Sequence, residues 1–222
     1  MDPLLSWAAI AAATVLIGAY ELHLVLAARR SPEATARSAH ALLRSEWVTA
    51  LSKQPGAEIV AVQTLRNSLM SATITASTAA LALMGSVSLA ASSAIRNGTL
   101  WAPPQNSARL VLELMLLAAL FASYVCSAMA MRYFSHAGFV LSLPVGSPPR
   151  ERRSPMAVAY VQRAGVLYSW GLRLFLFVAP IGAGLVNPIA MPVAAVALIF
   201  VLRLFDRAPD VAAVDVPSPG RL

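Results

Sequence analysis

The chain has 222 residues, of which 58% are apolar and only 12% are charged, and its mean hydropathy is +0.68. A soluble globular domain carries about 25% charged residues, so this composition excludes an ordinary soluble protein and predicts an integral membrane protein. The net charge of +7 comes from arginines that stand between apolar runs. Membrane topology accounts for arginines in such places, and we therefore expect the lipid bilayer, and no nucleic acid, as a partner.

The first apolar run predicts a transmembrane helix at residues 4–28. At 1.5 Å per residue, a helix of this length exceeds the roughly 30 Å hydrocarbon core of a bilayer. A signal peptide is the competing interpretation, but it needs a positively charged start, whereas this chain begins with Met1-Asp2-Pro3. We expect the helix to be retained and to end at Arg29-Arg30.

The segment at residues 33–54 is predicted to be an amphipathic helix on the cytoplasmic side. One of its faces would carry the apolar Leu42 and Leu43, and another would carry His40 and Arg44. A helix of this kind lies on the membrane surface or packs against the bundle.

The remaining apolar runs predict four further spans, at residues 67–95, 110–131, 171–185 and 189–205. The residues from Ala57 to Arg66 should project into water, because the whole second run is too long to lie in lipid. Glycine, asparagine and proline break the last apolar stretch at a tight turn, 186–188; one broken span or a re-entrant hairpin is the alternative. We expect a loop at 138–154 and a disordered tail at 206–222.

The distribution of basic residues orients these spans. With five spans, only Arg96 and Arg109 fall on the side of the N-terminus, and most other basic residues fall on the opposite side. The positive-inside rule then places the N-terminus outside and the C-terminus in the cytoplasm. Lys53 is the only lysine, which, with the abundant alanine, is typical of a GC-rich genome and favours a bacterial inner (plasma) membrane. The predicted fold class is an all-α integral membrane bundle of about five transmembrane helices with amphipathic cytoplasmic helices.

Charged residues inside predicted spans are costly and are usually paired or functional. Glu21 lies about 12 Å from the cytoplasmic end of its helix, and Arg66 and Arg173 lie near the cytoplasmic ends of theirs. We predict that Glu21 pairs with Arg66 or Arg173 inside the bundle; the alternative is that both arginines extend to lipid phosphates. Gln63 and Asn67 would complete a polar cluster around the pair.

Small polar residues form a row along the predicted span at 67–95. They recur every three or four residues and share one helical face: Asn67, Ser71, Thr75, Thr78, Ala82 and Ser86. In the span at 110–131, Ser123 and Ser127 have the same spacing. Such residues mark the faces on which membrane helices pack, so we interpret both rows as packing seams, with a polar path across the membrane as the alternative.

No motif for catalysis or cofactor binding is found: there is no HExxH, GxSxG or CxxC sequence and no phosphate-binding glycine loop. Cys126 is the only cysteine, so we expect neither an internal disulfide nor a cysteine-based metal site. The histidines, His23, His40 and His136, lie in separate segments. We therefore predict no enzymatic activity, no cofactor and no metal site; a histidine–carboxylate site is the alternative.

The helix that enters the membrane reads AVQTLRNSLMSAT at residues 61–73 and is followed by Ser77-Thr78. Together with the Arg132-Tyr133-Phe134 triplet and the Leu172-Arg173-Leu174-Phe175 run, it resembles the signature of the membrane proteins called domain of unknown function 599 (DUF599). The resemblance extends over residues 15–206. It implies a protein with several membrane spans and supplies no activity.

Three classes of function agree with these patterns. The first is a non-enzymatic membrane protein that packs with itself, as a homo-oligomer, or with a membrane-protein partner. The second is a small transporter or channel that uses the polar face of the helix at 67–95 and works as an oligomer. The third is a lipid-modifying enzyme, for which the sequence offers the least support.

Overall fold

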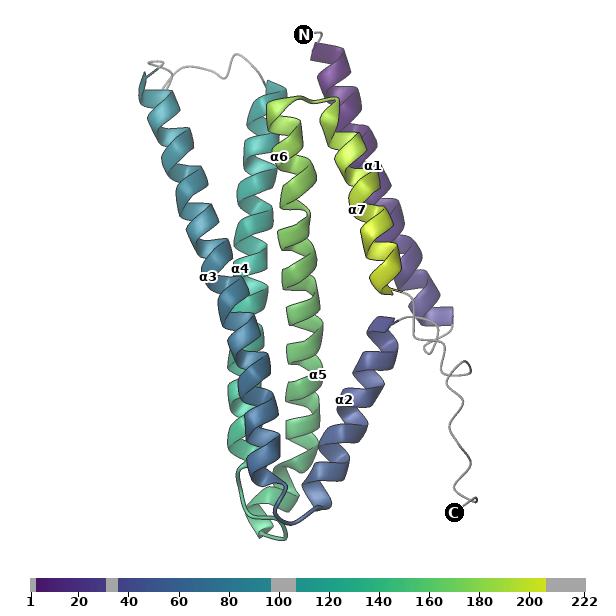
Figure 1. Cartoon of the computed structure of the whole chain (residues 1–222), viewed down its shortest axis with the longest axis vertical. Helices are drawn as coiled ribbons and strands as arrows, with labels where there is room; N and C mark the ends of the chain where they lie inside the picture. Colours follow the sequence, from purple (N-terminus) through teal and green to yellow (C-terminus); the bar gives the residue numbers. More distant parts are fainter. Residues whose placement is uncertain (1–2, 31–35, 97–106, 207–222) are drawn as a thin grey trace, which may run out of the picture.

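The computed structural model of the chain describes residues 3–30, 36–96 and 107–206, and these residues form seven α-helices and no strand (Figure 1). The helices are α1 (Pro3–Arg30), α2 (Ala36–Lys53), α3 (Glu58–Arg96), α4 (Ser107–Leu141), α5 (Pro148–Leu176), α6 (Val178–Val186) and α7 (Ala190–Asp206). The prediction of an all-α fold is confirmed. The predicted tail at 206–222 lies outside the described residues, except for Asp206.

Four helical stretches in the described part of the chain are long and apolar enough to cross a membrane. They are Leu4–Arg30, Glu58–Ser92, Ser107–Leu141 and Pro148–Val186, the last of which joins α5 to α6. The fifth predicted span corresponds to α7, which has 17 residues. Its length of about 25 Å is less than the roughly 30 Å of a hydrocarbon core. The structure therefore supports four membrane-crossing helices and leaves α7 as a short apolar helix beside them.

Most of the loop predicted at 138–154 is helical. α4 continues to Leu141 and α5 already begins at Pro148, so only a short turn separates them. The end of α4 stays helical because its apolar residues recur at helical spacing and are buried. These residues are Phe134, Ala137, Val140 and Leu141. The prolines at the start of α5 suit its first turn, where a backbone N–H has no helical partner.

A proline also interrupts the last long helix. α5 and α6 are separated at Phe177, three residues before Pro180. Because Pro180 has no backbone N–H, the carbonyl of Leu176 loses its helical partner. α6 continues nearly along the line of α5 (Figure 1) and ends where the tight turn is predicted. The predicted span at 171–185 is thus the C-terminal end of α5 together with most of α6.

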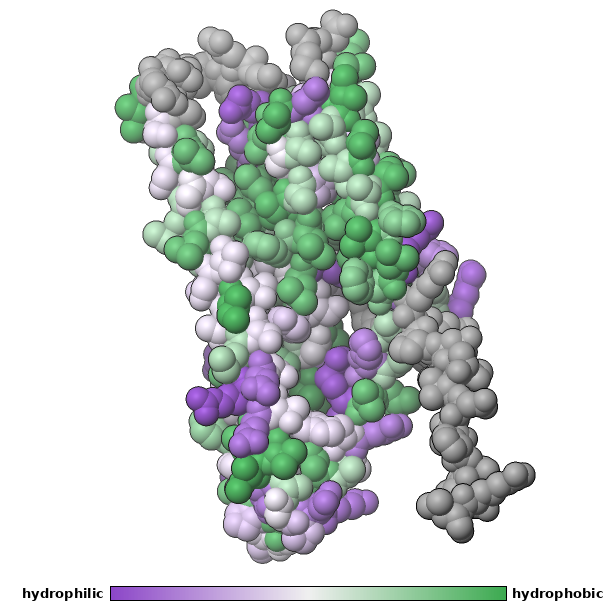
Figure 2. Space-filling view, in the orientation of Figure 1, coloured by the Kyte–Doolittle hydropathy of each residue, from purple (hydrophilic) through white to green (hydrophobic). Residues whose placement is uncertain are grey.

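The helices differ in length, and this divides the molecule into two halves. α3 and the α5–α6 stretch each have 39 residues, or about 58 Å, whereas α1 has 28 residues, or about 42 Å. α1 and α7 lie along one end of the long helices, and α2 packs on α5 at the other (Figure 1). We call the end with α1, α6 and α7 the apolar half and the end with α2 the basic half. Apolar residues dominate the surface of the first, and hydrophilic residues gather toward the second (Figure 2).

Each half has its own core. The core of the apolar half joins α1, α4, α6 and α7 through Ile10, Ala13, Ala108, Leu112, Ile181, Met191 and Ala195. The core of the basic half joins α2, α3, α4 and α5 through residues that include Val48, Leu65, Phe134, Leu141 and Val161. Helices of about 58 Å exceed a hydrocarbon core of roughly 30 Å, so part of this second core lies beyond the lipid, where the hydrophobic effect stabilises it.

α2 occupies most of the amphipathic helix predicted at 33–54, of which residues 33–35 lie outside the described residues. Its packed face is not the predicted apolar face. Leu42 and Leu43 are 53% and 62% exposed, whereas Arg44 lies against α5 and Val48, one turn further, is fully buried. The prediction left open whether the apolar face lies on the membrane surface or packs against the bundle. α2 packs on α5 through the face of Val48 and leaves the leucines pointing outward.

Candidate functional site

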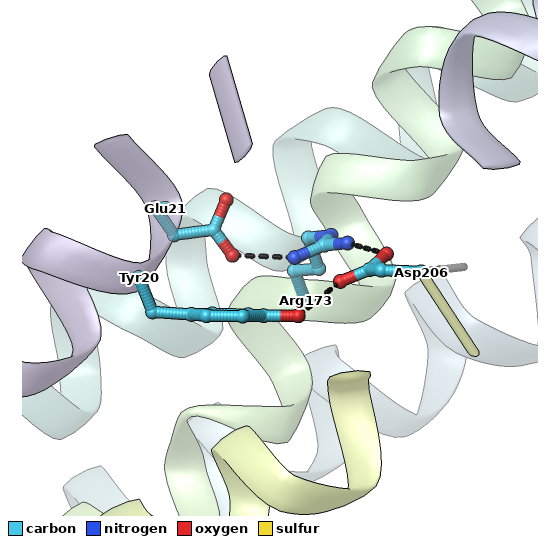
Figure 3. A network of polar contacts seen from close by, with 4 residues as sticks. All are labelled: Tyr20, Glu21, Arg173 and Asp206. Carbon is cyan, nitrogen blue, oxygen red and sulfur yellow. Dashed lines mark hydrogen bonds and ion pairs between the residues drawn. The ribbon is translucent and has the colours of Figure 1, made fainter. Parts of the chain in front are cut away.

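Four polar side chains meet between α1, α5 and α7, and we call them the Arg173 network: Tyr20, Glu21, Arg173 and Asp206 (Figure 3). Arg173 donates from Nη1 to Oε1 of Glu21 at 2.5 Å and from Nη2 to Oδ1 of Asp206. Tyr20 donates from Oη to Oδ2 of Asp206 at 2.6 Å. The side chains of Arg173, Glu21 and Asp206 are only 7%, 13% and 16% exposed.

The positions of these residues on their helices explain how they meet. Tyr20 and Glu21 are neighbours on α1, so a hydroxyl and a carboxylate reach the network from one turn. Arg173 comes from α5, one turn before that helix is interrupted, and Asp206 is the last residue of α7. Arg203, one turn earlier on α7, has its Cζ 5.9 Å from the centroid of the Tyr20 ring, which is a cation–π distance.

Electrostatics explains why these groups are paired. A charge that is taken out of water loses several kcal/mol of hydration energy, and only a well-placed opposite charge with further hydrogen bonds offsets that loss. Arg173 provides two donors in a fixed geometry, one for each carboxylate. Sliding of α1 or α7 along α5 would break a contact. The network therefore fixes the relative depth of three helices.

The structure brings together two of the five residues predicted to form a polar cluster. Glu21 contacts Arg173, which is one of the two partners predicted for it. Gln63, Arg66 and Asn67 are exposed on α3, and α3 and α1 lie on opposite sides of the bundle (Figure 1). The predicted five-residue cluster is therefore wrong for these three residues.

The depth assigned to Arg173 explains this error. The prediction placed the start of the membrane span of Arg173 at residue 171, on a helix expected from Pro155, whereas α5 begins at Pro148. Arg66 lies about 12 Å along α3, and Arg173 lies about 37 Å along α5. Because both helices start in the basic half, the two arginines differ in depth by about 25 Å. Arg66 instead lines a groove between α3 and α4 beside Phe139.

Most of the row of small polar residues on α3 faces outward, whereas Ser86 at its end lines a pocket with residues of α4 and α6. Asn67, Ser71 and Thr78 are exposed, and Thr75 and Ser86 are half-buried. Each hydroxyl of the row donates to the carbonyl oxygen four residues earlier in α3, at 2.8–3.1 Å. This local bonding satisfies the hydroxyl groups without another helix.

α3 packs on α4 through a different row, which consists mainly of alanines. Its buried alanines are Ala61, Ala72, Ala76 and Ala79. A row of methyl groups lets two backbones approach closely, which is the way membrane helices pack. The hydroxyl groups of the polar face bond within α3 instead, and packing of that face against another chain, which the prediction included, stays a prediction.

The two serines predicted as a seam on α4 are fully buried against α5. Ser123 donates from Oγ to the carbonyl oxygen of Gly171 at 2.7 Å. A Cβ atom on Gly171 would lie 2.6 Å from Oγ of Ser127. The missing side chain of Gly171 thus allows α4 and α5 to approach closely, as small residues do at membrane helix contacts.

A second buried arginine ties together helix ends in the basic half. Arg150 is 1% exposed. Its Nη1 donates to the carbonyl oxygens of Leu141, at 2.7 Å, and Leu143, and its Nη2 donates to that of Leu51 at 3.0 Å. These carbonyls stand at the ends of α4 and α2 or in the turn after α4, where helical partners are lacking. Arg150 thus joins α2, α4 and α5, and it forms no ion pair with an acidic residue in the described part of the chain.

Sequence reasoning missed Asp206, Tyr20 and the burial of Arg150. Asp206 falls at the start of the predicted tail, but an acid directly after an apolar run could have signalled a partner for Arg173. Tyr20 carries no signal beyond its position next to Glu21. The burial of Arg150 leaves no trace in the sequence, because its partners are backbone carbonyls that any residue would supply.

The acidic, histidine and cysteine side chains of the described residues are dispersed. No three of them lie close enough to share a metal ion within the described part of the chain. The network combines two carboxylates with one guanidinium and one phenol, which is an arrangement for pairing charges and for holding a proton.

The all-helical fold, the four long apolar helices and the paired charges between them define a membrane protein. A family model described as "Protein of unknown function, DUF599" matches residues 8–211, nearly the whole chain. The chain belongs to this family, and the predicted resemblance is confirmed. Neither a curated protein nor a solved structure matches the chain.

Proposed function

We propose that the protein is a non-enzymatic membrane protein that acts by binding a second membrane helix along the outward face of α3. That helix comes from another copy of the chain or from a partner membrane protein. The observation that carries the proposal is the row of Ser71, Thr75 and Thr78, which are exposed or half-buried and whose hydroxyl groups are satisfied by α3 itself. Small residues on an exposed helix face permit close approach of another helix in lipid.

The position of α3 supports this proposal. It lies at the edge of the bundle, while α1 and α7 lie on the other side (Figure 1). Leu81, Met84 and Leu89 are 70%, 66% and 73% exposed. The alanine row leaves most of the helix circumference available to lipid or to another protein.

We assign the protein to a bacterial inner membrane, with the N-terminus outside and the basic half in the cytoplasm. Exposed arginines in the basic half support this orientation: Arg132, Arg152, Arg153 and Arg163. In this proposal α7 is the fifth span. Its outward side chains are apolar, as Val193 and Phe200 show with 68% and 65% exposure, and its inner end is held by Asp206 in the network.

The test compares the oligomeric state of the full chain with that of a double variant, Thr75→Leu/Thr78→Leu, in lipid nanodiscs. Native mass spectrometry should give a dimer or larger assembly for the natural chain and a monomer for the variant, because leucines prevent close approach. Met84→Phe is the matched control, since Met84 is exposed roughly 120° around α3 from Thr78. If the natural chain is a monomer and captures no partner from its own membrane, the proposal fails.

A transporter is the second candidate, and one observation favours it. The buried network lies one turn from the interruption between α5 and α6 at Phe177, and interrupted helices often frame binding sites for substrates and ions. Tyr20, Glu21 and Asp206 are acidic groups that could pass a proton to one another within this site.

The transport candidate is tested in proteoliposomes that contain a pH-sensitive dye. Proton movement that is present with the natural chain and absent with Glu21→Gln would favour it. Glu113→Gln is the matched control, because Glu113 lies on α4 in an exposed pair with Arg109. Equal dye traces with empty liposomes would exclude proton transport under these conditions of gradient and lipid.

A further inference from the structure

Arg44 is a cation without a counter-charge in the described part of the chain. It projects from α2 onto α5 and is half-buried. Its Nε atom is buried and donates to no acceptor among the described residues. The ion pairs in this part of the chain involve Arg109 and Arg173, and not Arg44. Burial lowers the pKa of the Arg44 guanidinium from its ordinary value, which is the expected effect of desolvation without a compensating anion.

The surface of α5 is shaped to receive this guanidinium. A Cβ atom on Gly165 would lie 2.5 Å from Cζ and 2.5 Å from Nε of Arg44, too close for any side chain. Gly165 therefore holds space for the charged group at the contact between α2 and α5. Another buried arginine, Arg150, also has an Nε atom without an acceptor among the described residues, but its Nη1 and Nη2 atoms donate to carbonyl oxygens. No such bond is found for Arg44 in the described part of the chain.

The depth of Arg44 is that of the lipid headgroups. Glu21 contacts Arg173 and therefore marks a common level on α1 and α5. Gly165 precedes Arg173 by eight residues and Arg29 follows Glu21 by eight, so each lies about 12 Å nearer the basic half. α1 ends with Arg29 and Arg30, and arginines at the end of a span mark the membrane surface.

Exposed apolar side chains lie near the level of Arg44 on both α2 and α5. Leu42 and Leu43 on α2 are 53% and 62% exposed, and Val166 on α5 is 42% exposed. Exposed apolar side chains at the headgroup level suit acyl chains, and a cation between the two helices at the same level suits a lipid phosphate. A small soluble anion would use the cation and leave these apolar side chains uncovered.

We propose that Arg44 binds the phosphate of an anionic phospholipid headgroup in the leaflet at the basic half, with Gly165 providing the space for its guanidinium. A guanidinium binds phosphate through two parallel hydrogen bonds, which are stronger than bonds between neutral groups. The negative charge of the lipid compensates a cation that the described residues leave without one. This proposal is independent of whether α3 binds a second helix.

The test measures how much phosphatidylglycerol the full chain retains when it is released from mixed phosphatidylglycerol–phosphatidylcholine nanodiscs into a native mass spectrometer. Arg44→Met removes the charge and keeps an apolar stem, and Gly165→Ala displaces the guanidinium. We expect each variant to retain about five- to tenfold less phosphatidylglycerol than the natural chain. Arg163→Met, at an exposed arginine of α5, should retain it within about twofold, as expected for a cation that only adds to the general surface attraction. Equal loss in all three variants would overturn the proposal.

Thermal unfolding separates a lipid site from a structural role and from a site for free phosphate. In a neutral detergent, Arg44→Met should unfold at the same temperature as the natural chain or higher, because an uncompensated buried charge has been removed. Added phosphatidylglycerol should raise the unfolding temperature of the natural chain and not that of the variant. Lower stability of the variant in neutral detergent would assign Arg44 a structural role. An equal rise with inorganic phosphate alone would assign the site to a soluble anion; either result overturns the proposal.

Discussion

Arg173 and Arg150 lie about 35 Å apart along the same helix, both buried, yet they are satisfied in different ways. Arg173 is in the apolar half and pairs with two carboxylates, Glu21 and Asp206. Arg150 is in the basic half and donates to backbone carbonyls at the ends of other helices, such as that of Leu51. In one case the neutralising charge comes from side chains, and in the other the acceptors come from the backbone.

This difference follows from the surroundings of each half. In the lipid, a cation without an anion is costly, so Arg173 requires carboxylates whose identity the sequence must specify. At the turn beyond the lipid, the last carbonyls of α4 and α2 carry partial negative charge and lack helical partners. Arg150 meets that need. Neutral side chains can replace Arg173 and its two carboxylates together. They cannot replace Arg150 in the same way, because its partners are backbone carbonyls, which substitution does not remove.

The largest effect is expected at Arg173. Arg173→Met leaves two carboxylates buried without their partner, which should lower the free energy of unfolding in detergent by about 3–5 kcal/mol. Arg132→Met, at an exposed arginine of α4, is the control and should change little. The triple variant Glu21→Gln/Arg173→Met/Asp206→Asn should recover most of the loss. A triple variant as unstable as Arg173→Met would show that the network does more than pair charges.

A smaller loss is expected at Arg150. Arg150→Met removes the guanidinium donors from three carbonyl groups at the junction of α2, α4 and α5, at a cost of about 2–3 kcal/mol. Of these groups, the carbonyl of Leu51 keeps only a long bond from the backbone N of Gln54, at 3.4 Å. Water at the basic half replaces part of what is lost. Hydrogen exchange should become faster at the end of α4 and the start of α5 and stay unchanged at α7. Faster exchange throughout the chain would contradict the local role of Arg150.

The contact between α4 and α5 at Gly171 is a reference for the two arginines, because it involves neither the charge of Arg173 nor that of Arg150. Gly171→Ala would place a Cβ atom 2.6 Å from Oγ of Ser127 and 3.4 Å from the carbonyl oxygen of Ser123. Either the Ser127 hydroxyl must rotate within its buried site or the helices must move apart, which should cost about 1–2 kcal/mol. Gly182→Ala is the control, since a Cβ atom there meets nothing within 4 Å, and its unfolding temperature should not fall. Equal behaviour of the two variants would argue against a tight contact at Gly171.

The smallest effect is expected from the phenol of the network. Tyr20→Phe removes the hydrogen bond to Asp206 and leaves the ion pairs of Arg173 in place, at a cost of about 1 kcal/mol. Tyr124→Phe is the control, because Tyr124 is 39% exposed on α4. A loss as large as that of Arg173→Met would mean that the hydroxyl holds the carboxylate in position for the arginine.

The sequence predicted the apolar helices well and their starting points less well. Hydropathy follows directly from composition, so the runs that became α1, α3 and α4 are visible without a structure. The start of α5 at Pro148 is less visible, because prolines and arginines in the segment 144–153 resemble a loop. This error placed Arg173 too near the cytoplasmic end and brought Arg66 into the predicted cluster.

The face on which a helix packs is the other quantity that the sequence leaves open. On α2 the leucines point outward and Arg44 lies against Gly165, and on α3 the alanines pack while the hydroxyl groups face outward. In lipid, shape decides which side packs, because burial of apolar surface brings little gain there. The polarity of the residues alone therefore does not identify the face on which α2 or α3 packs.

The sequence by itself determined that the chain is an all-α membrane protein with long apolar helices, that its basic residues gather in one half, and that Glu21 needs a cation. Tertiary structure alone decided that the cation is Arg173, that Asp206 and Tyr20 join it, and that Arg44 has no counter-charge in the described part of the chain. The physical reason is that hydropathy is a property of a segment, whereas the meeting of two side chains depends on the depth and rotation of two helices. Depth and rotation are fixed by packing across the whole bundle.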